Sequence, residues 1–280
     1  DLMVKLGHSS VLLKVSGNII LLDPVFSERA SPVQWAGPKR FHQPPILIDQ
    51  LPKVDVVVIS HDHYDHLDKN SIKRLKNKVD NFVVPQSIGK YLKDWGVSTE
   101  QINELSWWEA IEINGLEFTA TPTQHFSGRG LLDKNSTLWA SWVIQGKDLR
   151  VFFSGDSGYF DGFKDIGERF GPFDVTFIET GAYNELWKDI HMTPEESIQA
   201  HIDLKGKVMI PIHNGTFDLA LHDWYEPLER VVLEANKQDV NLSTPTFGQL
   251  LSVNNIDKGT YWWKPFMVDT DNNALELATD

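Results

Sequence analysis

Short apolar runs alternate with amphipathic stretches along the whole chain. A run rich in β-branched residues, such as Val54–Ser60, is typical of a strand that is buried on both faces of a sheet. Val11–Val15 and Ile19–Asp23 are predicted to be strands joined by a hairpin turn at residues 16–18. Further strands are predicted at Phe82–Val84, Leu116–Thr121, Leu138–Ile144, Arg150–Ser154, Val175–Glu179 and Val208–Ile212.

Helical spacing of apolar residues predicts four helices. One of them has a clear start signal, because Thr193 is a good cap, Pro194 fits the first helical position and Glu196 completes a capping box. Strands and helices are mixed over the whole length, so we predict one domain over residues 1–280, an α/β sandwich. The predicted helices are Ser71–Asn77, Ser87–Trp95, Pro194–Leu204 and Leu219–Lys237.

Residues 24–50 break this pattern. The segment is rich in proline and has few regularly spaced apolar residues. A loop of this length inside a compact domain is usually either functional or disordered. Because Trp35, Phe41 and Ile46 are large and apolar, we expect an ordered loop that packs against another surface.

The composition excludes several classes of protein. The chain has 280 residues and no cysteine, which rules out disulfides, thiolate metal sites and a cysteine nucleophile. A net charge of −13 is unfavourable for binding a phosphate backbone, so no nucleic-acid partner is expected. No apolar run of about 18 residues and no signal-peptide pattern occur. The sequence starts without an initiator methionine, so we expect that an upstream piece is missing. We expect a soluble domain that is either cytoplasmic or peripherally membrane-associated.

The clearest chemical signal lies between Ser60 and His66, directly after the predicted buried strand. Imidazole nitrogens and carboxylate oxygens are ligands that Zn²⁺, Mn²⁺ and Fe²⁺ accept. Alternate residues of an extended segment point the same way, so His61 and His63 can reach one metal ion together. Asp65 and His66 follow where the chain turns, and can reach a second ion. The alternative interpretation is a polar loop with solvated histidines.

Four ligands do not complete two metal sites, so the others must come from later in the chain. Each candidate should follow a strand, because strand ends converge at one edge of a sheet. His125, Asp156 and His213 each follow a predicted strand, and glycines flank Asp156. Each of them alone could be an ordinary polar residue. We predict that His61, His63 and His125 hold one ion, that Asp65, His66 and His213 hold the other, and that Asp156 bridges them.

This pattern resembles the metallo-β-lactamase superfamily, whose signature is an H-x-H-x-D-H run followed by separated His, Asp and His ligands. The sequence is most similar to the N-acyl-phosphatidylethanolamine-hydrolysing phospholipase D family, over about residues 6–229. The Pro-rich loop and the Trp pairs narrow the resemblance to this branch. The matching stretches are Gly7–Ser10, Asp23–Pro32, Gly37–Phe41, Trp107–Glu109, Leu138–Trp142, Arg169–Asp174, Gly181–Tyr183 and His213–Phe217.

The resemblance implies an αβ/βα sandwich with a binuclear zinc site at its edge. It also implies hydrolysis of a phospholipid phosphodiester, with release of a phosphatidic-acid-like product. Eukaryotic members of the family are membrane-associated homodimers, so the expected partners are a phospholipid or other small-molecule substrate, a membrane surface and a second copy of the chain. Asn214 and Phe247 depart from the eukaryotic pattern, which leaves the head-group preference open.

The expected cofactors are two divalent ions, with Zn²⁺ as the first choice and Mn²⁺ or Fe²⁺ as alternatives. A hydroxide bridging the ions would attack phosphorus in line, because metal binding lowers the pKa of water from about 15.7 to about 7. The candidate catalytic residues are Asp65, which is also a candidate ligand, and His191. His191 directly precedes the predicted helix start, where anions are favoured, so it is expected either to orient a phosphate or to protonate the leaving group. Its alternative role is local packing.

Two other functions stay open. The same hydroxide can attack a carbonyl, which would make the chain a lactonase or another carboxyl-ester hydrolase. The second alternative is a metal-binding scaffold without turnover.

Other residues are expected to lie around the site. Asp23 and His8 are expected to contact the ligand side chains on the side away from the metal and to orient them. Trp35 and Trp187 are expected to face an acyl chain or a membrane. His201 and His222 are expected to be structural or exposed.

Overall fold

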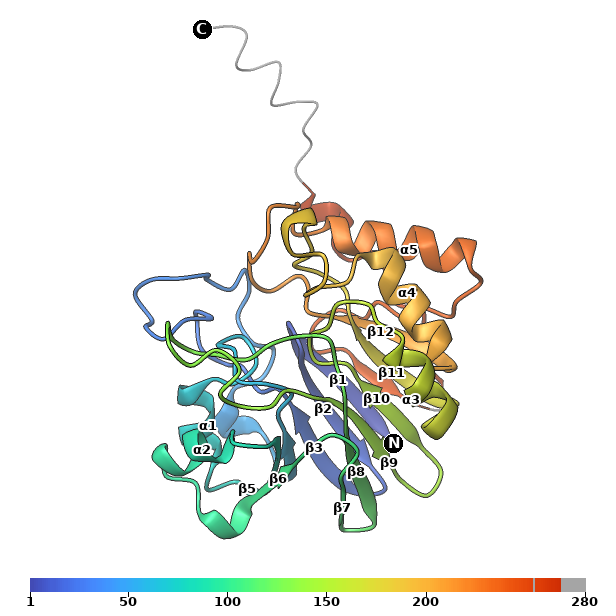
Figure 1. The fold of residues 1–280 in the computed structure, drawn as a ribbon. Helices are drawn as coiled ribbons and strands as arrows, with labels where there is room; N and C mark the ends of the chain where they lie inside the picture. Colours follow the sequence, from blue (N-terminus) through green and yellow to red (C-terminus); the bar gives the residue numbers. More distant parts are fainter. Residues whose placement is uncertain (254, 268–280) are drawn as a thin grey trace, which may run out of the picture.

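The computed structural model describes residues 1–253 and 255–267, which form two β-sheets packed face to face (Figure 1). The first sheet contains, in spatial order, β13 (Leu250–Ser252), β1 (Leu2–Gly7), β2 (Ser10–Val15), β3 (Asn18–Leu22), β4 (Val54–Val58), β5 (Val79–Pro85) and β6 (Ile102–Leu105). The second contains β12 (Gly206–Ile212), β11 (Phe173–Glu179), β10 (Arg150–Phe153), β9 (Ser141–Gln145), β8 (Leu116–Thr121) and β7 (Ala110–Ile113).

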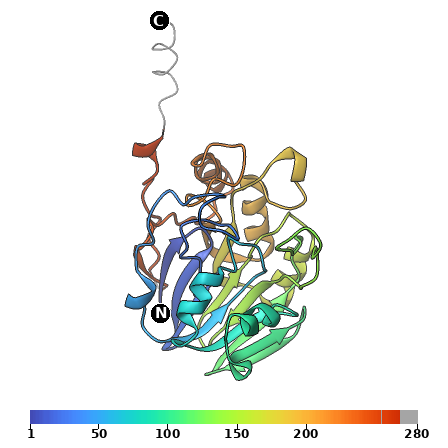
Figure 2. The same ribbon diagram turned by 90° about the vertical axis from the view of Figure 1, so that its left-hand side faces the viewer.

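Helices cover the outer face of each sheet. The α-helices are α1 (Lys69–Leu75), α2 (Gly89–Asp94), α3 (Gly162–Phe170), α4 (Pro194–Asp203) and α5 (Glu226–Lys237). Figure 2 shows α1 and α2 in front of the first sheet, and Figure 1 shows α3, α4 and α5 on the far side of the second. The layers therefore follow the predicted αβ/βα order. Within the described residues, no helix is long and apolar enough to cross a membrane.

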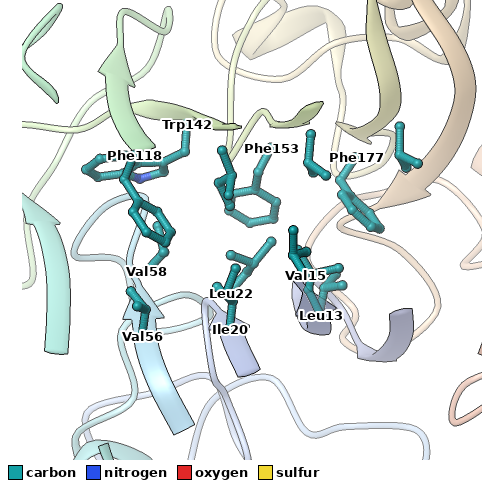
Figure 3. Packing of buried hydrophobic residues seen from close by; sticks show 14 of the residues in the cluster. Leu13, Val15, Ile20, Leu22, Val56, Val58, Phe118, Trp142, Phe153 and Phe177 are labelled. Atoms are coloured by element: carbon teal, nitrogen blue, oxygen red, sulfur yellow. The ribbon is translucent and has the colours of Figure 1, made fainter. Parts of the chain in front are cut away.

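The main core lies between the two sheets and is built from their inward-facing side chains (Figure 3). Successive side chains of a strand point to opposite faces. Val56 and Val58 accordingly face Phe118 and its neighbours in this core, whereas Val57 packs outward under α1 and α2. Both faces of β4 are buried, as the continuous β-branched run predicted.

Most predicted elements are confirmed, including the β2–β3 hairpin and the capping box that starts α4. The strand predicted at Leu138–Ile144 begins only at Ser141. Leu138 and Ala140 donate their N–H groups to Gln86 and Ser60, in loops of the first sheet, so this stretch crosses between the sheets before it pairs with β8.

The helix predicted at Leu219–Lys237 begins only at Glu226. Pro227 lies in its first turn, where a missing N–H costs nothing, and Leu221 in the preceding loop is exposed. The structure adds α3, β6, β7 and β13, which no pattern had indicated.

The Pro-rich loop is only partly packed. Ile46 joins the cluster outside the first sheet, and the ring of Phe41 lies 6.1 Å from that of Trp224. Trp35 does not pack against the described part of the domain, because its side chain is 82% exposed. It lies in a stretch without regular secondary structure, which holds no apolar surface against its indole ring.

Candidate metal centre

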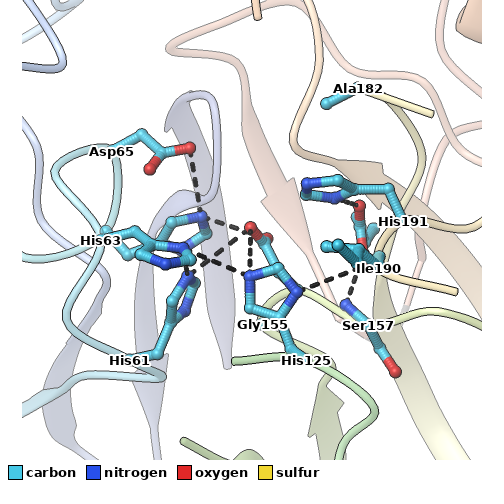
Figure 4. A network of polar contacts seen from close by, with 12 residues as sticks. His61, His63, Asp65, His125, Gly155, Ser157, Ala182, Ile190 and His191 are labelled. Carbon is cyan, nitrogen blue, oxygen red and sulfur yellow. Dashed lines mark hydrogen bonds and ion pairs between the residues drawn. The ribbon is translucent and has the colours of Figure 1, made fainter. Parts of the chain in front are cut away.

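The candidate ligands meet at one edge of the sandwich, where parallel strands of both sheets end. β3, β4 and β5 run parallel in the first sheet, and β10, β11 and β12 run parallel in the second. The segment His61–His66 leaves β4, and His125 follows β8. Asp156 follows β10 and His213 follows β12. All the predicted ligands therefore reach the same edge, from segments far apart in the sequence (Figure 4).

One group of ligand atoms comes from His61, His63, His125 and Asp156. The Nδ1 of His63 lies 2.9 Å from the Nε2 of His61 and 3.2 Å from the Nε2 of His125. Asp156 Oδ2 lies 3.6 Å from the Nε2 of His61. Atoms that ligate one ion at about 2.0–2.2 Å lie about 2.8–3.6 Å from one another, so this spacing fits one shared ion.

A second group comes from His8, Asp65, His66 and His213. Asp65 Oδ2 lies 3.2 Å from the Nε2 of His213 and 3.5 Å from the Nε2 of His66. His8 Nε2 lies 3.0 Å from the same oxygen. This group therefore has a fourth member, His8, in addition to the three predicted from the sequence.

Asp156 lies between the two groups. Its Oδ1 is 3.1 Å from His66 Nε2, and its Oδ2 is 3.1 Å from His213 Nε2. Asp156 Oδ1 and His66 Nε2 are fully buried, and although they lie 3.1 Å apart they make no hydrogen bond with each other or with any other described residue. Buried polar atoms without partners are rare in folded proteins. A cation coordinated by both atoms would satisfy them, so the donor set fits a metal.

The charges of the centre are also unusual. Burial lowers the pKa of His61 and of His125 well below the usual value, so both present the neutral ring that binds metals. Burial opposes the charge of Asp156, but the facing His213 and His66 hold the pKa of its carboxyl well below the usual value. Burial opposes the charge of His213 too, yet Asp156 raises its pKa to about 10. The buried carboxylate thus needs a positive counter-charge, which either protonated histidines or a metal ion can supply.

Supporting hydrogen bonds orient several ligands from behind. Asp23 Oδ2 lies 2.6 Å from the Nδ1 of His66 and also accepts from Ser60 Oγ. His125 Nδ1 lies 3.1 Å from the carbonyl oxygen of Ile190. Such contacts fix which ring nitrogen faces the metal. The structure therefore places Asp23 where the sequence predicted it, and places His8 against Asp65.

The backbone at this edge is held in sparsely populated conformations. His8, Asp23 and His213 all have positive φ angles, of 50°, 36° and 62°. Gly155, just before Asp156, has φ 57°, and a Cβ there would lie 2.6 Å from the Cβ of Ser60. Strained positions of this kind persist only where the surrounding structure holds them, and they concentrate at functional sites.

A cavity of about 360 Å³ opens over the two groups. Asp65, Asp156 and His213 line its floor, and His191 and Trp187 line its wall. His191 therefore lies beside the candidate centre, and its catalytic role stays a prediction. Trp187 faces the same space. His201 lies elsewhere and is buried, with its Nδ1 2.7 Å from Thr176 Oγ1.

Glu179, the last residue of β11, also lies at this edge but was not predicted as a site residue. Its side chain is fully buried, and its Oε1 contacts the Nδ1 of His191. The Oε2 accepts a 2.5 Å hydrogen bond from the N–H of Ser157. The available signal was a charged residue ending an otherwise apolar strand, at the same edge as the ligand-bearing strands.

The described residues form a sandwich of two sheets with grouped histidines and aspartates at one edge. A family model described as the β-lactamase superfamily domain matches residues 18–214. The chain belongs to the metallo-β-lactamase superfamily.

Individual relatives show which members of the superfamily this chain is similar to. An uncharacterized protein of Mycobacterium tuberculosis is 44% identical over 262 residues, covering 92% of this chain and 70% of the relative. N-acyl-phosphatidylethanolamine-hydrolyzing phospholipase D 1 of Caenorhabditis elegans is 37% identical over 262 residues, covering 88% of this chain and 74% of the relative. The crystal structure of an isothiocyanate hydrolase from Delia radicum gut bacteria shares the fold, with a TM-score of 0.71 and 18% identity over 90% of this chain and 98% of that one. The chain is a metallo-hydrolase with homologues named as phospholipases D.

Proposed function

We propose that this chain is a two-metal phosphodiesterase that cleaves a phospholipid in a phospholipase D-like reaction. The observation that carries the proposal is the position of Asp156, whose two oxygens lie 3.1 Å from His66 and His213 while Oδ2 also faces His61. A carboxylate in this position suits a pair of ions held close together, the arrangement used in many phosphodiester hydrolyses. The C. elegans relative, by its name, acts on an N-acylated phospholipid, which supports the substrate class.

The ligands in this proposal are those predicted from the sequence. One ion is held by His61, His63 and His125, and the other by Asp65, His66 and His213, with Asp156 between them. Zn²⁺ is the expected metal, because neutral imidazole with carboxylate is a common zinc ligand set, and Mn²⁺ and Fe²⁺ are the alternatives.

The bound ions would supply a nucleophilic oxygen from water at neutral pH and would offset the negative charge of the phosphate. The chain's own side chains would bind the lipid and act on the oxygens of the substrate. Phe126, Trp187 and Leu219 form an apolar wall of the cavity, which excludes water and can hold the apolar part of a lipid. His191 faces the same cavity and acts on the substrate directly, at a phosphoryl oxygen or at the leaving oxygen.

The loops around the centre carry exposed apolar side chains. Leu131 and Leu132 lie in the loop after His125 and are fully exposed, and Leu186 and Leu221 are 83% and 82% exposed. Solvent-exposed apolar groups of this size mark interaction surfaces when they gather near a site. Together with Trp35, they are proposed to contact the surface of a membrane, which would present a phospholipid to the cavity.

The test combines metal analysis with a substrate panel. We expect about two metal ions per chain, and hydrolysis of bis(p-nitrophenyl) phosphate and of N-acyl-phosphatidylethanolamine. Both activities should be lost in His63→Ala and Asp156→Ala. His201→Gln removes a buried histidine outside the centre and should keep metal and activity. A wild type that opens only lactones would instead be a carboxyl-ester hydrolase, and a metal-loaded wild type inert on the whole panel would be a scaffold.

A further inference from the structure

Glu179 and His191 form a pair at the rim of the cavity. Glu179 is 0% exposed, whereas the side chain of His191 is 15% exposed. The Glu179 carboxylate contacts the Nδ1 of His191 with one oxygen and the N–H of Ser157 with the other. Ser157 directly follows Asp156. One buried carboxylate therefore connects His191 to the loop that carries the central aspartate.

We propose that Glu179 is a positioning residue, which holds His191 so that its Nε2 meets the leaving oxygen of the substrate. This inference rests on the function proposed above. Because the Nδ1 of His191 is engaged by Glu179, only the opposite nitrogen is available to the cavity, and Figure 4 shows it directed toward the histidine cluster. A nitrogen of the His191 ring lies within 4.8 Å of the ligand atoms of Asp156 and His213, close enough to reach a substrate held there.

The contacts of Glu179 indicate a role in addition to packing. Burying a carboxyl group is expensive unless it is hydrogen-bonded, and an apolar residue at the end of β11 would avoid that cost. Both oxygens of Glu179 have partners, and the same residue is fixed through its backbone, since its N–H donates to Ser154 Oγ and its carbonyl accepts from Ser197 Oγ. A side chain held this firmly leaves the His191 ring little freedom to turn.

The assisted step is the departure of the alcohol. A water oxygen, which gives up one proton to the solvent, forms a new bond to phosphorus. As this bond forms, the bond between phosphorus and the leaving oxygen breaks, and its electron pair stays on the leaving oxygen. His191 Nε2–H donates its proton to the oxygen, and the product leaves as a neutral alcohol. Water then returns a proton to the imidazole. General acid catalysis of this kind contributes about 10²–10⁴-fold where the leaving group needs a proton, and little where it does not.

The test compares two substrates that share a phosphatidyl group. N-acyl-phosphatidylethanolamine has an alkoxide leaving group, which needs a proton, and phosphatidyl-p-nitrophenol has a stable aryloxide, which does not. With the first substrate, we expect His191→Gln to lower kcat about 10²–10⁴-fold. Glu179→Gln should lower it about 10–100-fold, the usual effect of removing a contact that orients a histidine. With the second substrate, both variants should stay within about threefold of wild type, and KM should change little for either substrate.

Two further variants sharpen this comparison. Asp174→Asn removes a carboxylate from the same strand, one that pairs with Lys207 at the surface, and should leave both activities unchanged. Glu179→Asp keeps the charge but withdraws it by one methylene, so it should repeat the selective loss even if Glu179→Gln does not fold. Elemental analysis should find wild-type metal content in every variant.

The outcomes separate the two proposals. If metal-loaded wild type cleaves neither substrate, the proposed function fails. If wild type cleaves both substrates and the Glu179 variants lose both activities equally, lose neither, or lose metal, the positioning role is overturned while the phosphodiesterase stands.

Discussion

The core between the sheets and the edge that carries the histidines are both buried, but they are stabilised differently. In the core, Leu13 and Phe118 belong to one cluster of buried apolar side chains, on strands that pair with their neighbours. At the edge, Asp23, His66 and Asp156 are just as buried, yet they are polar and several of their neighbours have strained backbones. The core therefore determines whether the chain folds, whereas the edge retains buried polar groups at a cost in stability, as is common at functional sites.

The largest expected effect of a change at the edge comes from Asp156→Asn. The amide keeps the shape of the side chain but removes the charge that faces both histidine groups. We expect phosphodiesterase activity to fall by at least about 10³-fold and metal content to drop, because a two-metal centre loses its shared ligand. Thermal unfolding followed by circular dichroism should still show a folded protein. Retention of metal and activity would contradict the comparison between edge and core.

The opposite result is expected in the core. Leu13 is 1% exposed and lies on β2, in the cluster between the sheets. Leu13→Ala should lower the free energy of unfolding by about 2–5 kcal/mol, through lost burial and a residual cavity. The molecules that remain folded should keep their metal and most of their turnover, measured below the unfolding transition. A selective loss of activity in a stable Leu13→Ala protein would show that core and edge are not separable.

A buried histidine away from the edge, His201, should affect how the stability of the protein depends on pH. Burial lowers the pKa of His201 from 6.5 to about 4. The unfolded chain therefore takes up a proton near pH 6.5 that the folded chain binds only near pH 4, so stability falls as the pH drops through that range. We expect this group alone to cost about 2–3 kcal/mol by pH 4. Denaturant unfolding at several pH values should show a shallower pH dependence for His201→Gln than for wild type, and equal slopes would rule the contribution out.

A smaller effect is expected from a change at Asp23, which contacts the ligand candidate His66 but is not itself a predicted ligand. Asp23→Asn keeps a side chain of the same size beside His66 but removes the charge of the group that orients its ring. Loss of such a contact typically costs about 10–100-fold in metal affinity or activity. Competition with a chelator should therefore strip metal from Asp23→Asn at lower chelator concentration than from wild type. Identical stripping curves would show that the ring of His66 does not depend on Asp23.

Much of the candidate metal centre could be predicted from the sequence, and the physical reason differs from one segment to another. The His61–His66 segment is local, so its residue types and spacing are readable directly. His125 and His213 are distant in sequence, but the rule that strand ends converge was enough to group them. The structure brings them together as expected, and their roles as ligands stay predictions.

What escaped prediction depends on tertiary contacts. Glu179 is a single acidic residue at a strand end, and only the folded structure shows that it faces His191. The helix α3 contains Gly162 and Gly167, which weaken a helical signal, and Gly167 is required by packing because a Cβ there would lie 2.1 Å from the carbonyl oxygen of Asp203. Leu138 looked like part of a strand because an apolar run cannot show which partner its N–H groups will find.

Anomalous X-ray diffraction from crystals of the purified metal-loaded protein tests the central claim most directly. The account predicts two metal peaks at the edge of the sandwich, one bound by His61, His63 and His125 and the other by Asp65, His66 and His213. Asp156 should contact both, with ligand distances of about 2.0–2.2 Å. A single peak, or peaks bound by other residues, would contradict a two-metal centre built on Asp156.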